Sequence, residues 1–296
     1  MRISTTINYC ISPCKESAEG CVSELKRYKA IGFDCLDAIM CGAADADSPL
    51  RQKDWRGWAH RVADAAAEVG ITIVQSHVPM HNFCTRPEGT PEDLDEMVDR
   101  AIEAAAIFGA PWTVAHPATA LGEGRSMNAS RGKNIEFFSK RLETAAKFGI
   151  GIALENMADF EGGGRRRWYC AEVEELCDLI DTLDQGTGLV GACWDFGHAN
   201  LVYPSQREAL LYLGQRLKVT HTHDNSGLRD EHLAPFRGNV DFFEIMKTLK
   251  EMDYRHDLSF EVKRMLNPRV PESLKDNLWR HLLDVGRFLV SLYEDI

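Results

Sequence analysis

The chain has 296 residues, of which 44% are hydrophobic and 27% are charged, and it carries a formal net charge of −11. This composition allows one large compact domain over residues 1–296, and no apolar run approaches the roughly 20 residues that a membrane-spanning helix needs. The acidic balance argues against nonspecific attraction to nucleic acid or to an anionic membrane.

The first ten residues, MRISTTINYC, lack a long apolar stretch, so we expect a first strand here rather than a signal peptide. Nine cysteines are scattered without a C-x-x-C pair, which favours reduced thiols over a disulfide framework or a thiolate zinc site. Both observations predict a cytoplasmic protein.

Strand and helix patterns alternate about eight times along the chain. The expected strands lie near residues 2–8, 33–39, 71–77, 112–116, 150–155, 189–195, 217–223 and 257–261. Helical patterns between them, such as 54–70, 91–109 and 134–149, end in Gly70, Gly109 and Gly149, which are natural helix C-caps. A closing helix is expected from about 273 to 294. The alternation predicts an α/β fold, a single (β/α)8 TIM barrel.

Four of the expected strands end in a residue that can bind a metal ion. The runs GIGIALE, GLVGACWD, LKVTHTH and HDLSFE end in Glu155, Asp195, His223 and Glu261. In a parallel barrel all strand C-termini open on one face, so these residues are expected to converge there. Three carboxylates with one imidazole form a cage for a divalent cation. One such residue could be a helix cap, but four crowded buried carboxylates and imidazoles need a cation or shared protons.

Further histidines are expected at the same face. His77 and His116 end the third and fourth strands, and His198 follows Asp195 by three residues around a glycine-containing turn. His221 and His223 share one strand face, since they are two residues apart. We expect His223 to be the ligand because it lies nearer the expected end of the strand.

The motifs ALEN, WDFGHAN, HTHDN and FEVK resemble the xylose-isomerase-like TIM-barrel superfamily, which includes sugar isomerases, sugar epimerases and endonuclease IV. Resemblance to its ketose 3-epimerases implies metal ligands at Glu155, Asp195, His223 and Glu261. It also implies that Glu161, His198 and Arg229, found at the offsets of that family, contact substrate oxygens. His77, His116 and Trp112 are further candidates for substrate binding, with Trp112 expected near the rim, where it could stack on a sugar.

The resemblance extends to endonuclease IV, which holds three zinc ions. Its nine ligands would correspond here to His77, His116, Glu155, Asp195, His198, His223, Asp230, His232 and Glu261. Asp230 and His232 are therefore possible additional metal ligands. However, the chain has ENMADFEGG where the nucleases have a characteristic E-N-T-A-G-Q-G run, and this difference argues against DNA repair.

The expected activity is that of a metal-dependent sugar isomerase or epimerase. Removing a proton next to a carbonyl forms an enediolate that a divalent ion stabilises, while Glu155 and Glu261 transfer protons as a pair. The ligand set favours Mn²⁺, with Mg²⁺, Co²⁺ or Zn²⁺ as alternatives. The expected partners are a small carbohydrate and further copies of the chain in a homo-oligomer.

Three alternatives remain open from the sequence. A lyase or dehydratase acting on a keto-sugar or related acid would use the same proton abstraction. A zinc phosphodiesterase acting on abasic DNA would need three metals and a basic groove. A noncatalytic sugar-binding or protein-binding barrel would bind metal weakly. The substrate could be a free, phosphorylated or oxidised sugar.

Overall fold

A computed structural model describes residues 1–10, 12–86, 88–121, 126–160, 166–262, 265 and 269–294. Eight parallel strands form its central sheet, in the order β10-β1-β2-β3-β4-β5-β8-β9. Their bounds are β1 Ile3–Asn8, β2 Cys35–Ile39, β3 Thr72–His77, β4 Trp112–Ala115, β5 Gly151–Glu155, β8 Val190–Asp195, β9 Leu217–His221 and β10 Leu258–Phe260. A bridge between Thr222 and Phe260 joins the ends of β9 and β10, so the sheet closes into a barrel.

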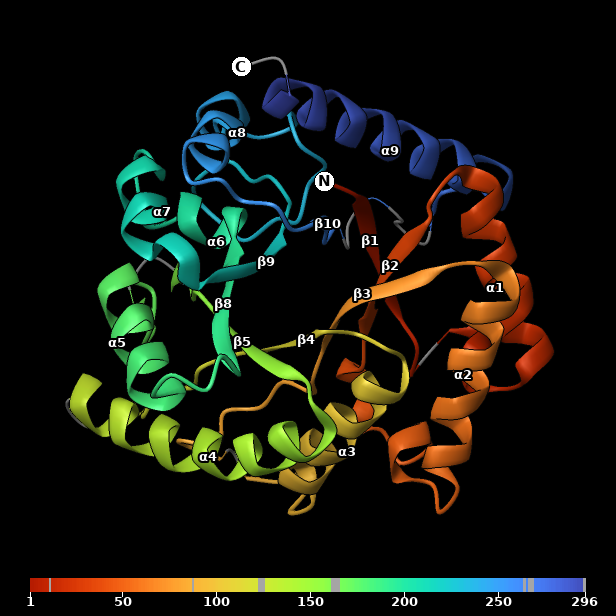
Figure 1. The fold of residues 1–296 in the computed structure, drawn as a ribbon, viewed down its shortest axis with the longest axis horizontal. Coiled ribbons are helices and arrows are strands. Elements are labelled where there is room, and N and C mark those ends of the chain that lie inside the picture. Colours follow the sequence, from red (N-terminus) through yellow and green to blue (C-terminus); the bar gives the residue numbers. More distant parts are fainter. Residues whose placement is uncertain are drawn as a thin grey trace.

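Helices surround this barrel as an outer ring (Figure 1). They are α1 Ala18–Ile31, α2 Trp55–Val69, α3 Leu94–Ile107, α4 Met127–Phe148, α5 Val173–Asp184, α6 Phe196–Asn200, α7 Arg207–Leu213, α8 Phe242–Glu251 and α9 Glu272–Glu294. Short 3-10 helices cover Pro13–Lys15, Cys41–Ala44, Pro49–Arg51 and Gly214–Arg216, and β6 Asp159–Phe160 pairs antiparallel with β7 Arg166–Arg167. Within the described ranges, no helix is both long and apolar enough to cross a bilayer.

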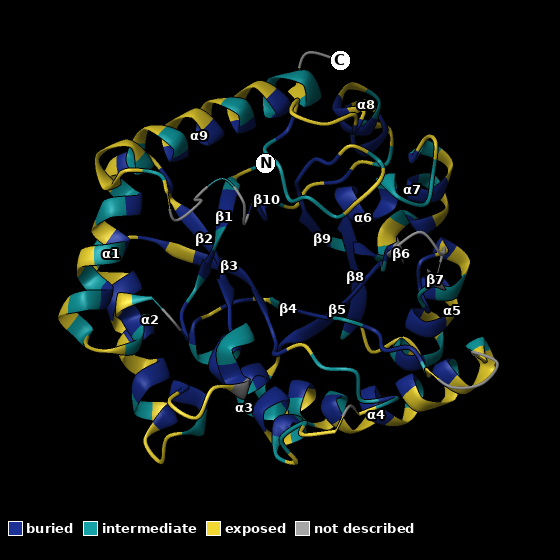
Figure 2. Cartoon of the chain, turned by 180° about the vertical axis from the view of Figure 1, so that it is seen from behind, coloured by how far each residue is buried: buried dark blue, intermediate teal, exposed yellow. Residues whose placement is uncertain are grey.

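The strands are buried on both faces, whereas the helices expose their outer surfaces (Figure 2). Most of the hydrophobic core lies between the strands and the helices. Inside the barrel, a small apolar cluster of Val114, Ala153, Cys193 and Val219 packs against Trp112. Many of the other side chains inside the barrel are polar. The barrel interior can therefore bind a ligand as well as form part of the core.

The predicted (β/α)8 barrel is confirmed, and the predicted strands agree with the observed ones to within two residues. Gly70 and Gly149 cap α2 and α4 in the left-handed conformation, with φ of 70° and 68°, as their positions suggested. The fourth helix begins earlier than expected, because the Ser126 side chain accepts a hydrogen bond from the Ala129 amide as its N-cap. The seventh strand ends at His221 rather than at residue 223, and this difference changes the ligand assignment.

Candidate metal centre

Four ligand-type side chains meet where the strands end. Glu155 and Asp195 are the last residues of β5 and β8, His221 is the last of β9, and Glu261 follows β10. One ligand atom from each of the four lies within 4.8 Å of the others, and all four residues are buried. Parallel strands bring these residues together although 106 positions separate Glu155 from Glu261 in the sequence numbering.

The histidine in this four-residue group is His221, whereas His223 belongs to two neighbouring groups, one with Asp195 and His198 and one with His232 and Glu261. The choice of His223 depended on its being nearer the strand end, but β9 already ends at His221. His221 Nδ1 lies 3.2 Å from Glu155 Oε1 and 3.5 Å from Glu261 Oε2. His223 instead places Nε2 2.9 Å from the Asp195 carboxylate, beside the group rather than within it.

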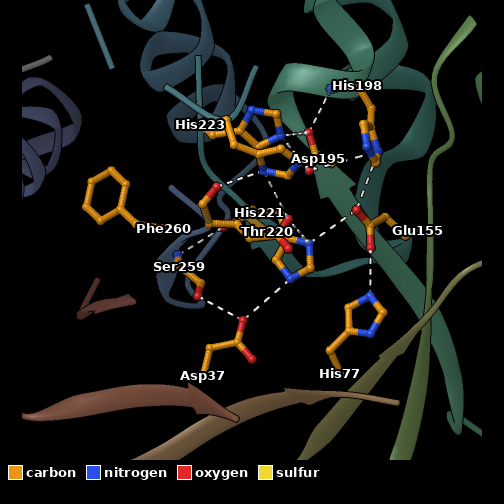
Figure 3. Close-up of polar contacts among 12 residues, drawn as sticks. Asp37, His77, Glu155, Asp195, His198, Thr220, His221, His223, Ser259 and Phe260 are labelled. Atoms are coloured by element: carbon orange, nitrogen blue, oxygen red, sulfur yellow. Dashed lines mark hydrogen bonds and ion pairs between the residues drawn. The ribbon is translucent and has the colours of Figure 1, made fainter. Parts of the chain in front are cut away.

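Glu155 is surrounded by imidazoles (Figure 3). His116 Nε2 lies 3.0 Å and His77 Nε2 3.4 Å from its Oε2, while His198 Nδ1 lies 3.4 Å from its Oε1. Burial opposes ionisation of this carboxyl, but His221 and His116 outweigh burial and hold the pKa of Glu155 well below its usual value. Glu155 is therefore a buried carboxylate that the neighbouring imidazoles stabilise.

Asp195 is held in place by backbone contacts. It is the N-cap of α6, and its Oδ1 accepts a 2.7 Å hydrogen bond from the His198 amide. The Asn156 side chain accepts from the Asp195 amide at 2.6 Å and donates to the Asp195 carbonyl at 3.0 Å. Because Asn156 directly follows Glu155, these bonds fix the ends of β5 and β8 relative to each other.

Asp230 and His232 reach the centre from the loop after β9. His232 Nε2 lies 2.8 Å from Asp230 Oδ2, and Asp230 Oδ1 lies 3.6 Å from His223 Nε2. The rings of His223 and His232 stack with centroids 4.1 Å apart. His232 has φ of 48°, a conformation that is rare outside glycine and that is found at functional sites.

A buried carboxylate organises this loop. Asp224 accepts hydrogen bonds from the amides of Asn225, Gly238 and Val240 at 2.8, 2.8 and 3.0 Å. The Asn225 side chain in turn donates to the Gly197 carbonyl at 2.8 Å. The Asp224 bonds hold the two ends of the loop together, and the Asn225 bond ties the loop to α6. The sequence interpretation assigned no role to Asn156, Asp224 or Asn225, although each lies next to a candidate ligand in the motifs ALEN and HTHDN.

The residues fit a divalent cation on grounds of chemistry and of unmet hydrogen-bonding capacity. Within the described part of the chain, Glu155 Oε2, His223 Nδ1 and Asp230 Oδ1 are buried side-chain atoms without a hydrogen-bond partner. Such atoms carry a large desolvation penalty unless a ligand satisfies them. Three carboxylates and one imidazole favour Mn²⁺, Mg²⁺ or Co²⁺, and the surrounding histidines also suit Zn²⁺.

Further groups with metal-binding geometry share members with the central one. They are His77 with His116 and Glu155, Glu155 with Cys193 and His221, Asp195 with His198 and His223, and His223 with His232 and Glu261. In each group the ligand atoms lie within 4.8 Å of one another. Every residue expected to bind metal from the sequence therefore lies in this connected network or, for Asp230, in contact with it.

The contacts described above do not include three of the expected substrate-binding residues. Trp112 is the first residue of β4 and lines a cavity with Pro111 and His256, so it lies at the N-terminal end of the barrel; the expectation of a rim position is wrong. Arg229 is exposed on the loop after β9. Glu161 lies outside the described residues.

Comparison with known proteins identifies the family of this chain and proteins that share its fold. A family model described as "Xylose isomerase-like TIM barrel" matches residues 25–284. The uncharacterized protein MJ1311 of Methanocaldococcus jannaschii is 32% identical over 267 residues, which cover 88% of this chain and 85% of that protein. A D-tagatose 3-epimerase-like protein has a similar structure with a TM-score of 0.71 and 23% identity, covering 98% of this chain and 100% of the other. An L-ribulose 3-epimerase has a TM-score of 0.72 and 18% identity, covering 99% and 96%.

Proposed function

The chain belongs to the xylose isomerase-like TIM-barrel family, and we propose that it is a divalent-metal-dependent sugar isomerase or epimerase. The observation that carries this proposal is the convergence of Glu155, Asp195, His221 and Glu261 within 4.8 Å at the C-terminal end of the barrel. This is the end at which barrel enzymes of this kind place their active sites. The similarity of the fold to sugar epimerases supports a carbohydrate substrate.

In the proposed reaction, Glu155 and Glu261 act as the proton-transfer pair. They come from β5 and from the end of β10, and both approach His221 Nδ1, at 3.2 and 3.5 Å. Two carboxylates that flank one point allow one to accept a proton from a carbon next to a carbonyl while the other returns a proton. A bound divalent ion would polarise the carbonyl and make that carbon more acidic.

The surrounding residues would position sugar hydroxyls. His116 keeps 22% of its side chain exposed although its Nε2 contacts Glu155 at 3.0 Å, so it reaches both the centre and the solvent. His198 contacts Glu155 and Asp230, and the buried His77 places its Nε2 3.4 Å from Glu155 Oε2. Arg229 and Glu161 stay in the proposal as substrate contacts from loops. We further propose that the substrate is a ketose or keto-sugar, free, phosphorylated or oxidised, and that the enzyme is a cytoplasmic homo-oligomer.

Solvent hydrogen exchange tests this activity. Protein loaded with Mn²⁺ is incubated in deuterated water with a panel of ketoses, ketose phosphates and keto-sugars, and deuterium next to the carbonyl is measured by mass spectrometry. We expect incorporation with at least one substrate, lowered about 100-fold or more in Glu155→Gln and in Glu261→Gln. Glu174→Gln makes the same chemical change at an exposed position of α5 and should keep full exchange.

The outcome also separates the other candidate functions. Exchange accompanied by loss of water from the substrate would indicate a lyase or dehydratase. Equal exchange in all variants, or none with any substrate in a protein that holds its metal, would contradict the proposal. The contacts of Asp230 and His232 with the centre favour one further candidate, a three-zinc phosphodiesterase, which abasic DNA and a metal count near three would identify.

A further inference from the structure

Asp37 is a charged residue inside the barrel that the proposed reaction does not use. It lies in the middle of β2 and has no exposed surface. Its neighbours Leu36 and Ala38 belong to the main hydrophobic core. Since side chains alternate along a strand, Asp37 points to the opposite face, which is the barrel interior.

All the polar contacts given by the described residues reach one carboxylate oxygen of Asp37. Gln75 Nε2 donates to Oδ2 at 2.8 Å, and Ser259 Oγ donates to it at 3.2 Å. His221 Nε2 lies 3.4 Å from the same oxygen (Figure 3). His221 is the one group among these three that can carry positive charge. A buried carboxylate is costly unless it is paired and hydrogen-bonded, so the contact requires a proton on His221 Nε2.

That requirement determines what the other nitrogen of His221 can do. Nδ1 faces Glu155 Oε1 and Glu261 Oε2 at 3.2 and 3.5 Å. In a neutral ring that is protonated at Nε2, Nδ1 presents a lone pair toward these two carboxylates. Three acceptors cannot face one another at this distance without a proton or a cation between them. The ring is thus oriented with its donor toward Asp37 and its acceptor toward the metal centre.

We propose that Asp37 is the positioning residue of the metal centre, holding His221 as the Nε2–H tautomer so that Nδ1 is the metal-ligating atom. The inference rests on the proposed metal-dependent function. A carboxylate that orients a ligating histidine commonly changes metal affinity 10–100-fold when it is removed. Gln75 and Ser259 would keep the Asp37 carboxylate in place from the neighbouring strands β3 and β10.

The test compares Mn²⁺ affinity in the full chain and in Asp37→Asn, with the free ion followed by electron paramagnetic resonance. Asn keeps the size of the side chain but removes its charge. We expect the affinity to fall about 10–100-fold. Asp184→Asn is the matched control: Asp184 accepts from the Val190 amide at 2.9 Å at the start of β8, so its loss affects stability far from the metal centre. The control should bind Mn²⁺ as the parent does.

Nitrogen NMR of the zinc-loaded parent protein, labelled with ¹⁵N-histidine, gives a second readout that needs no folded Asp37 variant. The His221 signals are assigned by their absence in His221→Gln. We expect a protonated Nε2 and a coordinated Nδ1. Coordination through Nε2, or unchanged Mn²⁺ affinity in folded Asp37→Asn, would overturn the role of Asp37 and leave the proposed function standing. A parent protein that binds no Mn²⁺ would overturn both.

Discussion

Gly197 lies directly against the imidazole of His223, so that a methyl group on its α-carbon would overlap Cε1 of the ring. His223 is fully buried and its Nε2 contacts the Asp195 carboxylate at 2.9 Å. The ring therefore has little room to move away. Because residue 197 is a glycine, the first turn of α6 can pack directly against the His223 ring.

Gly197→Ala should lower the free energy of unfolding of the metal-free protein by about 1–3 kcal/mol, the range that overpacking of a buried site commonly costs. It should also weaken Mn²⁺ binding, because His223 and Asp195 must shift. Urea unfolding and Mn²⁺ titration measure the two effects. Gly132→Ala, in an exposed part of α4 with open space around it, should instead raise stability by about 0.5–1 kcal/mol. Equal behaviour of both variants would contradict the steric argument.

Replacing His221 should lower the affinity for Mn²⁺ more than replacing His223. His221→Gln removes a member of the four-residue group and should weaken Mn²⁺ binding by more than the 10–100-fold typical of residues around a metal site. His223→Gln should have a smaller effect. Elemental analysis after dialysis and Mn²⁺ titration provide the comparison. A larger loss in His223→Gln would restore the assignment made from the sequence.

Metal loading should release protons. Burial opposes protonation of His198, but Asp195, Asp230 and Glu155 outweigh burial and raise the pKa of His198 to about 10. At about pH 8 the metal-free ring is therefore protonated, and a cation bound beside Glu155 would repel that charge. Mn²⁺ affinity should rise with pH. Calorimetry in two buffers of different ionisation enthalpy measures the release, and identical heats in both would show that none occurs.

The same raised pKa has a consequence for the metal-free protein. Because the pKa of His198 is higher in the folded chain than its ordinary value of about 6.5, its contribution to stability is fully present below that value. The contribution is lost as the pH rises toward 10. Thermal unfolding of metal-free protein should thus occur at lower temperature at high pH, whereas His198→Gln should reduce this dependence.

Asp230→Asn should show how many ions the centre holds. Asp230 contacts His198, His223 and His232 but is not a member of the four-residue group. If one ion is held by that group, elemental analysis should give about one metal per chain in both the parent and the variant. A parent count near three that falls in Asp230→Asn would indicate a multinuclear centre and favour the phosphodiesterase.

The sequence predicted the barrel and the convergence of Glu155, Asp195 and Glu261, because each of these residues ends a short apolar run that is recognisable locally. Choosing between His221 and His223 required the end of β9, and the pattern LKVTHTH does not show where strand pairing stops. The predicted rim position of Trp112 is wrong because Trp112 begins β4, and proximity to a strand does not tell which end of the barrel a side chain occupies.

Asp37 and Asn156 illustrate what local patterns cannot show. In CLDAI, one Asp among apolar residues gives no sign that it meets Gln75, His221 and Ser259, which come from three other strands. Asn156 bonds the backbone of Asp195, 39 positions away. Both roles depend on pairing between distant strands, which periodicity within one segment does not report.

The last edge of the barrel joins β9 to β10, where Thr222 bridges Phe260. The Thr222 amide donates to Ser259 at 2.7 Å, and the Glu261 amide donates to Thr222 at 3.1 Å. His221 and Glu261 stand on the two sides of this edge. An ion bound by both residues would link β9 to β10 and so stabilise the closed barrel. Metal-free protein should therefore begin to unfold locally at this edge, with amide exchange rising first in residues 217–223 and 258–262.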